Sequence, residues 1–127
     1  MTISEAIAKA DEQRPNNNIS TATKIFWLNE TETRVKELAD GRILADGESY
    51  SADTYDSETD QNTELLVPDG YAGLYPLYLV AMIDYSQSSP AVYANSSYAY
   101  ENAWGRFAAW FAREHRQKEN GQFKYYE

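Results

Sequence analysis

Residues 71–115 carry aromatic and aliphatic side chains at intervals of three or four, and this pattern is interrupted at 88–90. Such spacing gathers apolar side chains on one face of an α-helix, so it predicts two helices, at about 71–87 and from about 91 to 116 or beyond. Pro90 suits the first position of the second helix, whereas Pro76 must lie in the first turns of the preceding helix or kink it. The apolar positions are Tyr71, Leu74, Tyr75, Tyr78, Met82 and Tyr85 in the first helix, and Val92 or Tyr93, Tyr100, Trp104, Phe107, Phe111 and His115 in the second.

The N-terminal residues predict a helix over about 3–13. Thr2 and Glu5 have the spacing of a capping box, in which hydroxyl and carboxylate each accept a hydrogen bond from a free backbone amide of the first turn. Pro15 ends this helix, because the residue before a proline is pushed out of the α region.

A second helix is predicted over about 21–39. Ser20 or Thr21 suits its N-cap, and Gly41 stands where a C′ glycine belongs. Glu32 interrupts an otherwise apolar stripe. The stripe consists of Ile25, Leu28, Val35 and Leu38.

The segment 42–64 changes in character. After Arg42 it carries acidic residues with no basic residue among them, and Ser and Thr are frequent. It is predicted to be a long loop, or to contain a short hairpin that pairs 42–44 with 64–67. Loops of this length are usually functional or disordered. Its acidic residues are Asp46, Glu48, Asp53, Asp56, Glu58, Asp60 and Glu64.

Together these signals predict a mainly α fold: a small bundle of four helices, or five as an alternative, with the acidic segment between helices 2 and 3. The 127 residues fit a single domain over 1–127. The polar tail, about 117–127, carries Phe123, Tyr125 and Tyr126, which either fray or dock on a neighbouring subunit. No signal peptide or membrane-length apolar run is readable, so a soluble, cytoplasmic product is expected.

The sequence offers no constellation typical of an enzyme. There is no cysteine, and His115 is the single histidine; a satisfied residue at the helix end is the favoured interpretation for it. No phosphate-binding glycine motif or nucleophile elbow occurs. The run 56–60 resembles the start of a calcium loop, but Gln61 replaces the required glycine. We therefore predict no catalytic, cofactor-binding or metal-binding residues.

The net charge and the tyrosine content indicate instead that the function depends on binding surfaces. A net charge of −9 disfavours tight nucleic-acid binding, which requires Lys and Arg against phosphates. The 11 tyrosines and three tryptophans fit either a half-buried core or a protein interface. Both interpretations stay open for Tyr71, Tyr75, Tyr78 and Tyr85.

Three stretches, in this order and spacing, carry a likeness to a known family. The first is Thr2-Ile3-Ser4-Glu5-Ala6-Ile7, leading to Arg14-Pro15-Asn16. The second is Lys24-Ile25-Phe26-Trp27-Leu28-Asn29-Glu30. The third is Asn62-Thr63-Glu64-Leu65-Leu66-Val67-Pro68, continued by Tyr71, Leu74-Tyr75, Tyr78-Leu79, Ile83-Asp84-Tyr85 and Tyr93-Ala94-Asn95-Ser96.

These stretches resemble the small head–tail connector proteins (adaptor or head-completion proteins) of tailed phages and of prophages in Gram-positive bacteria. The likeness covers most of the chain except 42–61 and the tail. The helix end Phe111-Ala112-Arg113-Glu114-His115 departs from the family's aromatic–Asn–Arg–x–His run at position 112. The resemblance carries no catalytic residues.

The resemblance implies a structural virion protein, made in the host cytoplasm, that forms a ring beneath the portal after DNA packaging. Such rings commonly hold twelve copies, although the isolated subunit can be a monomer. The implied partners are further copies of the chain, the portal protein and the neck or tail completion proteins. DNA would pass nearby without specific binding, and no membrane is involved.

The acidic segment is the candidate interface or channel loop, as a protruding segment that becomes ordered on assembly. The residues assigned to it are Asp46, Glu48, Asp53, Asp56, Glu58, Asp60 and Glu64. Two other functions remain open. One is a small acidic regulatory or inhibitory protein that mimics DNA, and the other is a hydrolase that uses paired carboxylates.

Overall fold

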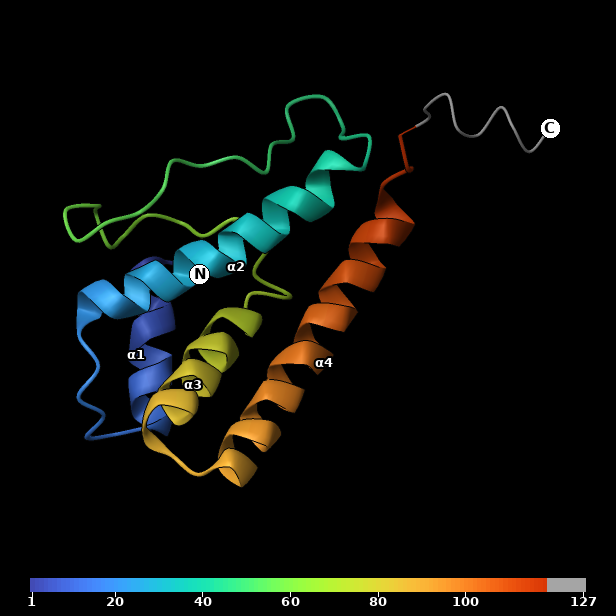
Figure 1. Cartoon of the computed structure of the whole chain (residues 1–127). Coiled ribbons are helices and arrows are strands. Elements are labelled where there is room, and N and C mark those ends of the chain that lie inside the picture. Colours follow the sequence, from blue (N-terminus) through green and yellow to red (C-terminus); the bar gives the residue numbers. More distant parts are fainter. Residues whose placement is uncertain (119–127) are drawn as a thin grey trace.

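A computed structural model describes residues 1–118, which form a bundle of four α-helices (Figure 1). The mainly α fold is confirmed for this part of the chain, where no β-strand and no fifth helix occur. Most of the predicted tail, residues 119–127, lies outside the described residues. The helices are α1 (Ile3–Gln13), α2 (Thr21–Asp40), α3 (Leu74–Gln87) and α4 (Pro90–Glu114).

Three of the four helices begin at the predicted capping signals. The capping box of α1 is complete: the Glu5 amide donates to Thr2 Oγ1 at 3.1 Å, and the Thr2 amide donates to Glu5 Oε1 at 3.0 Å. Ser20 is the N-cap of α2 and accepts from the amide of Thr23 at 3.1 Å. Pro90 occupies the first turn of α4.

The helix α3 begins later than predicted. Residues 71–73 form turns in place of a helix, with the Tyr71 amide donating to the carbonyl of Pro68 at 2.9 Å. The helix then starts at Leu74, so Pro76 lies in its first turn. Its missing amide removes no hydrogen bond there, because the first amides of a helix have no partner within the helix.

Two predictions about helix ends were wrong. Gly41 is the C-cap of α2 and has a φ of −83°, so the left-handed C′ conformation predicted for it is not used. The helix α4 ends at Glu114, before the predicted residue 116, because His115 has an extended backbone with φ −134° and ψ 125°.

The predicted hairpin between 42–44 and 64–67 was also wrong. The two ends of the acidic segment pair with different, distant parts of the chain. Ile43 donates its amide to the carbonyl of Arg116 at 2.8 Å, beyond the end of α4. Leu65 donates to the carbonyl of Met1 at 2.9 Å, before the start of α1. The segment therefore links the end of α4 to the start of α1.

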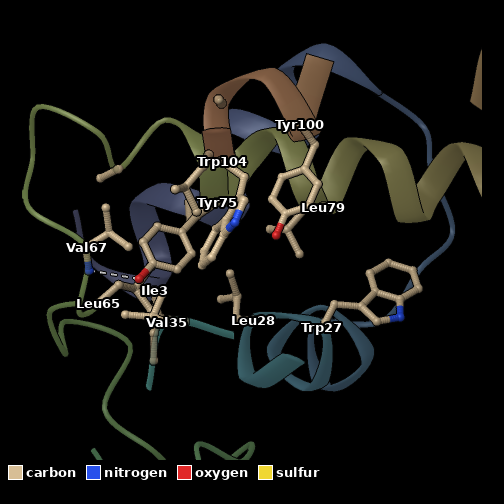
Figure 2. Packing of buried hydrophobic residues seen from close by; sticks show 14 of the residues in the cluster. Ile3, Trp27, Leu28, Val35, Leu65, Val67, Tyr75, Leu79, Tyr100 and Trp104 are labelled. Atoms are coloured by element: carbon tan, nitrogen blue, oxygen red, sulfur yellow. Dashed lines mark hydrogen bonds between the residues drawn. The ribbon is translucent and has the colours of Figure 1, made fainter. Parts of the chain in front are cut away.

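The core is built around α3, which contacts each of the other three helices (Figure 1). Eight of its fourteen residues are buried. Figure 2 shows Tyr75 and Leu79 of this helix meeting side chains from α1, α2 and α4 and from the segment that precedes α3. The partners labelled there are Ile3, Trp27, Leu28, Val35, Leu65, Val67, Tyr100 and Trp104.

Candidate interaction site

The acidic segment is fastened to the bundle at Glu32, the residue that interrupts the apolar stripe of α2. The Glu32 carboxylate is 2% exposed and accepts hydrogen bonds from three donors. Tyr55 donates to Oε2 at 2.8 Å, the Leu66 amide donates to Oε2 at 3.0 Å, and the Tyr75 hydroxyl donates to Oε1. One carboxylate thus joins α2 and α3 to Tyr55 within the acidic segment and to Leu66 just beyond its end.

The Tyr75 hydroxyl extends this hydrogen-bond network. The Val67 amide donates to the Tyr75 hydroxyl at 2.9 Å, as the dashed line in Figure 2 shows. Burial raises the pKa of the Glu32 carboxyl above its ordinary value, although the three donated hydrogen bonds act in the opposite direction. Burial raises the pKa of the Tyr55 and Tyr75 hydroxyls as well, so both phenols stay protonated and donate.

A second anchor joins the segment to the end of α4. His115 is buried, with its ring stacked on Phe111 at 3.9 Å between centroids. Its Nδ1 lies 2.9 Å from the carbonyl oxygen of Phe111 and its Nε2 lies 2.8 Å from Glu48 Oε2. Both neighbours are acceptors, so the protonated ring can donate from both nitrogens, which favours the imidazolium form. The prediction of a satisfied residue at the helix end is confirmed.

We expect the His115 ring to titrate above its ordinary pKa of 6.5. Burial lowers this pKa, but the hydrogen bonds to Glu48 and Phe111 raise it by more. Stability from the pair is therefore fully present below pH 6.5 and is lost as pH rises through the raised value. The chain has one histidine, so its ring proton resonance gives the midpoint by NMR without ambiguity.

The variant Glu48→Gln is the control for that titration. It removes the negative charge beside the imidazolium and should move the His115 midpoint back toward lower pH. A midpoint that is the same in the variant and in the unaltered chain would show that Glu48 does not hold the ring.

A third anchor lies at the N-terminus. The amino group of Met1 donates to Glu64 Oε2 at 3.0 Å and also contacts Asp69. Between the anchors the segment follows α2: Lys36 Nζ donates to the carbonyl of Ala52 at 2.8 Å, and Asn29 Oδ1 accepts the amide of Tyr55 at 2.9 Å. The segment therefore packs along the bundle (Figure 1).

The seven candidate acidic residues fall into two groups. Glu48 and Glu64 are used within the molecule, as described above. The other five side chains are exposed and form no ion pair with any residue between 1 and 118. These five are Asp46, Asp53, Asp56, Glu58 and Asp60.

Several of the tyrosines and other aromatic residues lie on the surface. Tyr75 is fully buried and Tyr71 and Tyr78 are half-buried, whereas Tyr85 on α3 is 67% exposed. Phe26 on α2 is 60% exposed and Tyr98 on α4 is 70% exposed. Tyr75 is therefore a core residue, whereas the interface interpretation stays a prediction for the exposed Tyr85.

An ion pair with one buried member fixes the other end of the bundle. Asp84 of α3 is fully buried, and Arg14 donates to both its oxygens, from Nε at 2.7 Å and from Nη2 at 2.8 Å. Ser96 of α4 donates to Oδ2 at 2.7 Å. The arginine holds the pKa of the Asp84 carboxyl below its ordinary value. This network joins the end of α1 to α3 and α4.

The described residues hold no group of three or more acidic or histidine side chains suited to a metal ion. In the calcium-like run, Asp56 Oδ1 accepts the amide of Glu58 at 2.8 Å within its own turn. The Glu32 carboxyl, with its raised pKa, is enclosed by its three donors and is not presented to a substrate. No helix within residues 1–118 is both long and apolar enough to span a membrane.

Sequence reasoning missed Glu32 and Asp84 as organising residues, although each carried a signal. An acidic residue on an apolar helical stripe, as at position 32, requires a buried partner. Asp84 lies between Ile83 and Tyr85 in a helix with no other charge.

Comparisons with protein-family models, with curated proteins and with solved structures find no match to this chain.

Proposed function

We propose that this chain is a structural adaptor subunit of a virion, of the phage head–tail connector kind, that assembles into a ring beneath the portal. The observation that carries the proposal is the exposure of large aromatic side chains on three helices, at Phe26, Tyr85 and Tyr98. Aromatic residues are enriched among the side chains that dominate binding energy at protein interfaces. A subunit in a ring also needs two different contact surfaces, one for each neighbour.

The three stretches that resemble connector proteins support the same proposal through the fold. They supply buried residues on which this bundle depends, among them Ile3, Leu28, Val67, Tyr75 and Asp84. A likeness in core residues concerns architecture, and the step from architecture to function is an analogy. The exposed aromatic residues add a reason for assembly that does not depend on that analogy.

The proposed partners are further copies of the chain, the portal protein and the neck or tail completion proteins, with the virion neck as the location. DNA passing through the ring would meet a chain with a net charge of −9. Acidic surfaces repel phosphates and leave DNA mobile, which suits a channel.

Deleting the gene from the phage or prophage genome that encodes it tests the proposal. We expect electron microscopy to show DNA-filled heads without tails, and we expect the unaltered gene supplied in trans to restore complete particles. Complete, infectious particles from the deletion strain would contradict the proposal.

One observation favours a second candidate, a regulatory protein that mimics DNA. The four exposed acids of 53–60 present charge of a single sign on one segment. A DNA mimic would act as a soluble competitor of DNA for a basic protein, and the deletion would leave particle structure unchanged. The deletion strain therefore separates the two candidates.

A further inference from the structure

The solvent-facing side of α4 has a composition that the fold of one chain does not explain. Six exposed residues recur at helical spacing and share one face of this helix. The face is uncovered by any other helix, and α4 stands at the edge of the bundle (Figure 1). We call it the outer face; it consists of Tyr98, Asn102, Gly105, Arg106, Ala109 and Arg113.

Gly105 leaves the centre of the outer face without a side chain. Glycine in a helix interior destabilises the helix by about 1 kcal/mol relative to alanine. A Cβ atom at Gly105 would meet nothing within 4 Å, so no contact within the chain requires its absence. Such a position permits the close approach of another molecule, and Tyr98, 70% exposed, lies two turns away.

The outer face is also basic on an acidic chain. Arg106 and Arg113 are exposed, and neither forms an ion pair with any other residue of 1–118. The acids of α4 lie off this face, and Glu101 is engaged by Arg34 at 3.0 Å. Two arginines that form no ion pair within residues 1–118 give this face a local positive charge on a chain with a net charge of −9.

The complementary surface lies on the same chain. Asp53, Asp56, Glu58 and Asp60 are exposed in the segment beyond α2, which Figure 1 shows in green on the side away from α4. Asp56 and Asp60 accept backbone amides within this segment and fix its turns. A negative surface and a positive surface on opposite sides of one molecule suit a head-to-tail contact between copies.

We propose that the outer face of α4 in one copy docks on the 53–60 segment of the next copy. This contact rests on the proposed function, since it would join neighbours in the ring. Arg106 and Arg113 pair with the acidic side chains, Gly105 and Ala109 allow close approach, and Tyr98 supplies apolar contact. Two arginines are too few to hold a nucleic acid against the net charge of the chain, so a second copy is the favoured occupant.

Cross-linking tests the contact, because the chain has no native cysteine. The paired variant Ala109→Cys with Ser57→Cys should give a ladder of disulfide-linked multimers, both free at high concentration and bound to DNA-filled heads. Each single variant should give no multimer beyond a dimer. The control pair, Ala109→Cys with Ala22→Cys, uses an exposed residue of α2 outside both surfaces and should give no ladder.

Charge reversal is a second test of the proposed contact. The variants R106E/R113E and D53K/E58K should each weaken self-association by about tenfold or more, and the combined four-residue variant should recover it. Lys9→Glu, an exposed reversal on α1, should have little effect. Association should also weaken as salt concentration rises.

The outcomes separate this contact from the proposed function. A missing ladder, or a four-residue variant that associates no better than its parents, overturns the contact. If rings still form on heads in that case, the adaptor function stands and the subunits meet through other surfaces. If the deletion strain makes complete particles, the adaptor function fails.

Discussion

Replacing Glu32 with alanine is expected to lower the free energy of unfolding by about 3 to 5 kcal/mol. The change leaves three donors without an acceptor: the buried Tyr55 and Tyr75 hydroxyls and the part-buried Leu66 amide. Each unsatisfied buried donor costs about 1 to 3 kcal/mol, and the lost side chain adds a cavity. Urea denaturation followed by circular dichroism measures the loss.

The matched control is Glu30→Ala, two residues away on the same helix. Glu30 is exposed and accepts one hydrogen bond, from Tyr78 at 2.8 Å. Its loss should cost no more than about 1 kcal/mol. Equal losses in the two variants would show that the Glu32 network does not hold the fold.

The Glu32 variants also test whether this residue fastens the acidic segment. In Glu32→Gln an amide oxygen in the place of Oε2 can still accept from Tyr55 and Leu66, so we expect a smaller loss of stability than in the alanine variant. Hydrogen exchange at the amides of Leu66 and Val67 should be faster in both variants than in the unaltered chain, with the larger increase in the alanine variant. Unchanged exchange at these two amides would place the anchor of the segment elsewhere.

Replacing Asp84 with alanine is the second change with a large expected effect, a loss of about 2 to 3 kcal/mol. Removing a fully buried carboxylate leaves the Arg14 guanidinium without its counter-charge. The Ser96 hydroxyl loses its nearest acceptor, although the carbonyl of Val92 still lies 3.0 Å away. The Arg14 side chain is 35% exposed, so water can reach part of its guanidinium, and the cost comes mainly from the lost charge-assisted hydrogen bonds and from the cavity left at the buried position. Thermal and urea unfolding measure the change.

A surface pair of the same chemistry provides the comparison. Arg34 donates to both oxygens of Glu101, at 3.0 and 3.1 Å, but that carboxylate is more than half exposed. Glu101→Ala should therefore cost no more than about 1 kcal/mol, since water replaces the lost partner. Similar losses in Asp84→Ala and Glu101→Ala would contradict the role assigned to burial.

The Asp84 pair also predicts a pH dependence with a definite sign. The pKa of the Asp84 carboxyl is lowered from its ordinary 3.8, chiefly by the hydrogen bonds from Arg14. The stabilisation is therefore present above pH 3.8 and is lost as pH falls through the lowered value. Asp84→Asn should be less stable at neutral pH and lose less of its stability in acid.

Local signals explain why most helix boundaries could be predicted from the sequence. The capping box at Thr2, the cap at Ser20 and the proline at position 90 each act within one turn of the helix they begin. The start of α3 was misplaced because 71–73 has helical spacing but closes as turns.

Distant pairing explains what the sequence could not predict. The two ends of the acidic segment form hydrogen bonds with Arg116 and Met1, which lie far from them in the sequence. A local sequence pattern cannot predict such pairing, and it favoured a hairpin between the two ends. Glu32 could be predicted only as an interruption of the apolar stripe, because its hydrogen-bond donor Tyr75 lies 43 residues away in the sequence. Likewise, only the fold divides the seven acids into two that form ion pairs within residues 1–118 and five that form none there.

The adaptor proposal is tested most directly by adding the purified chain to DNA-filled, tailless heads from the deletion strain and measuring bound copies by sedimentation. We predict saturable binding of one ring of copies per head, commonly twelve in connector proteins, and recovery of tail attachment. Heads that lack the portal should bind none. A chain that stays in the supernatant, or that binds heads equally with and without the portal, would contradict the proposal.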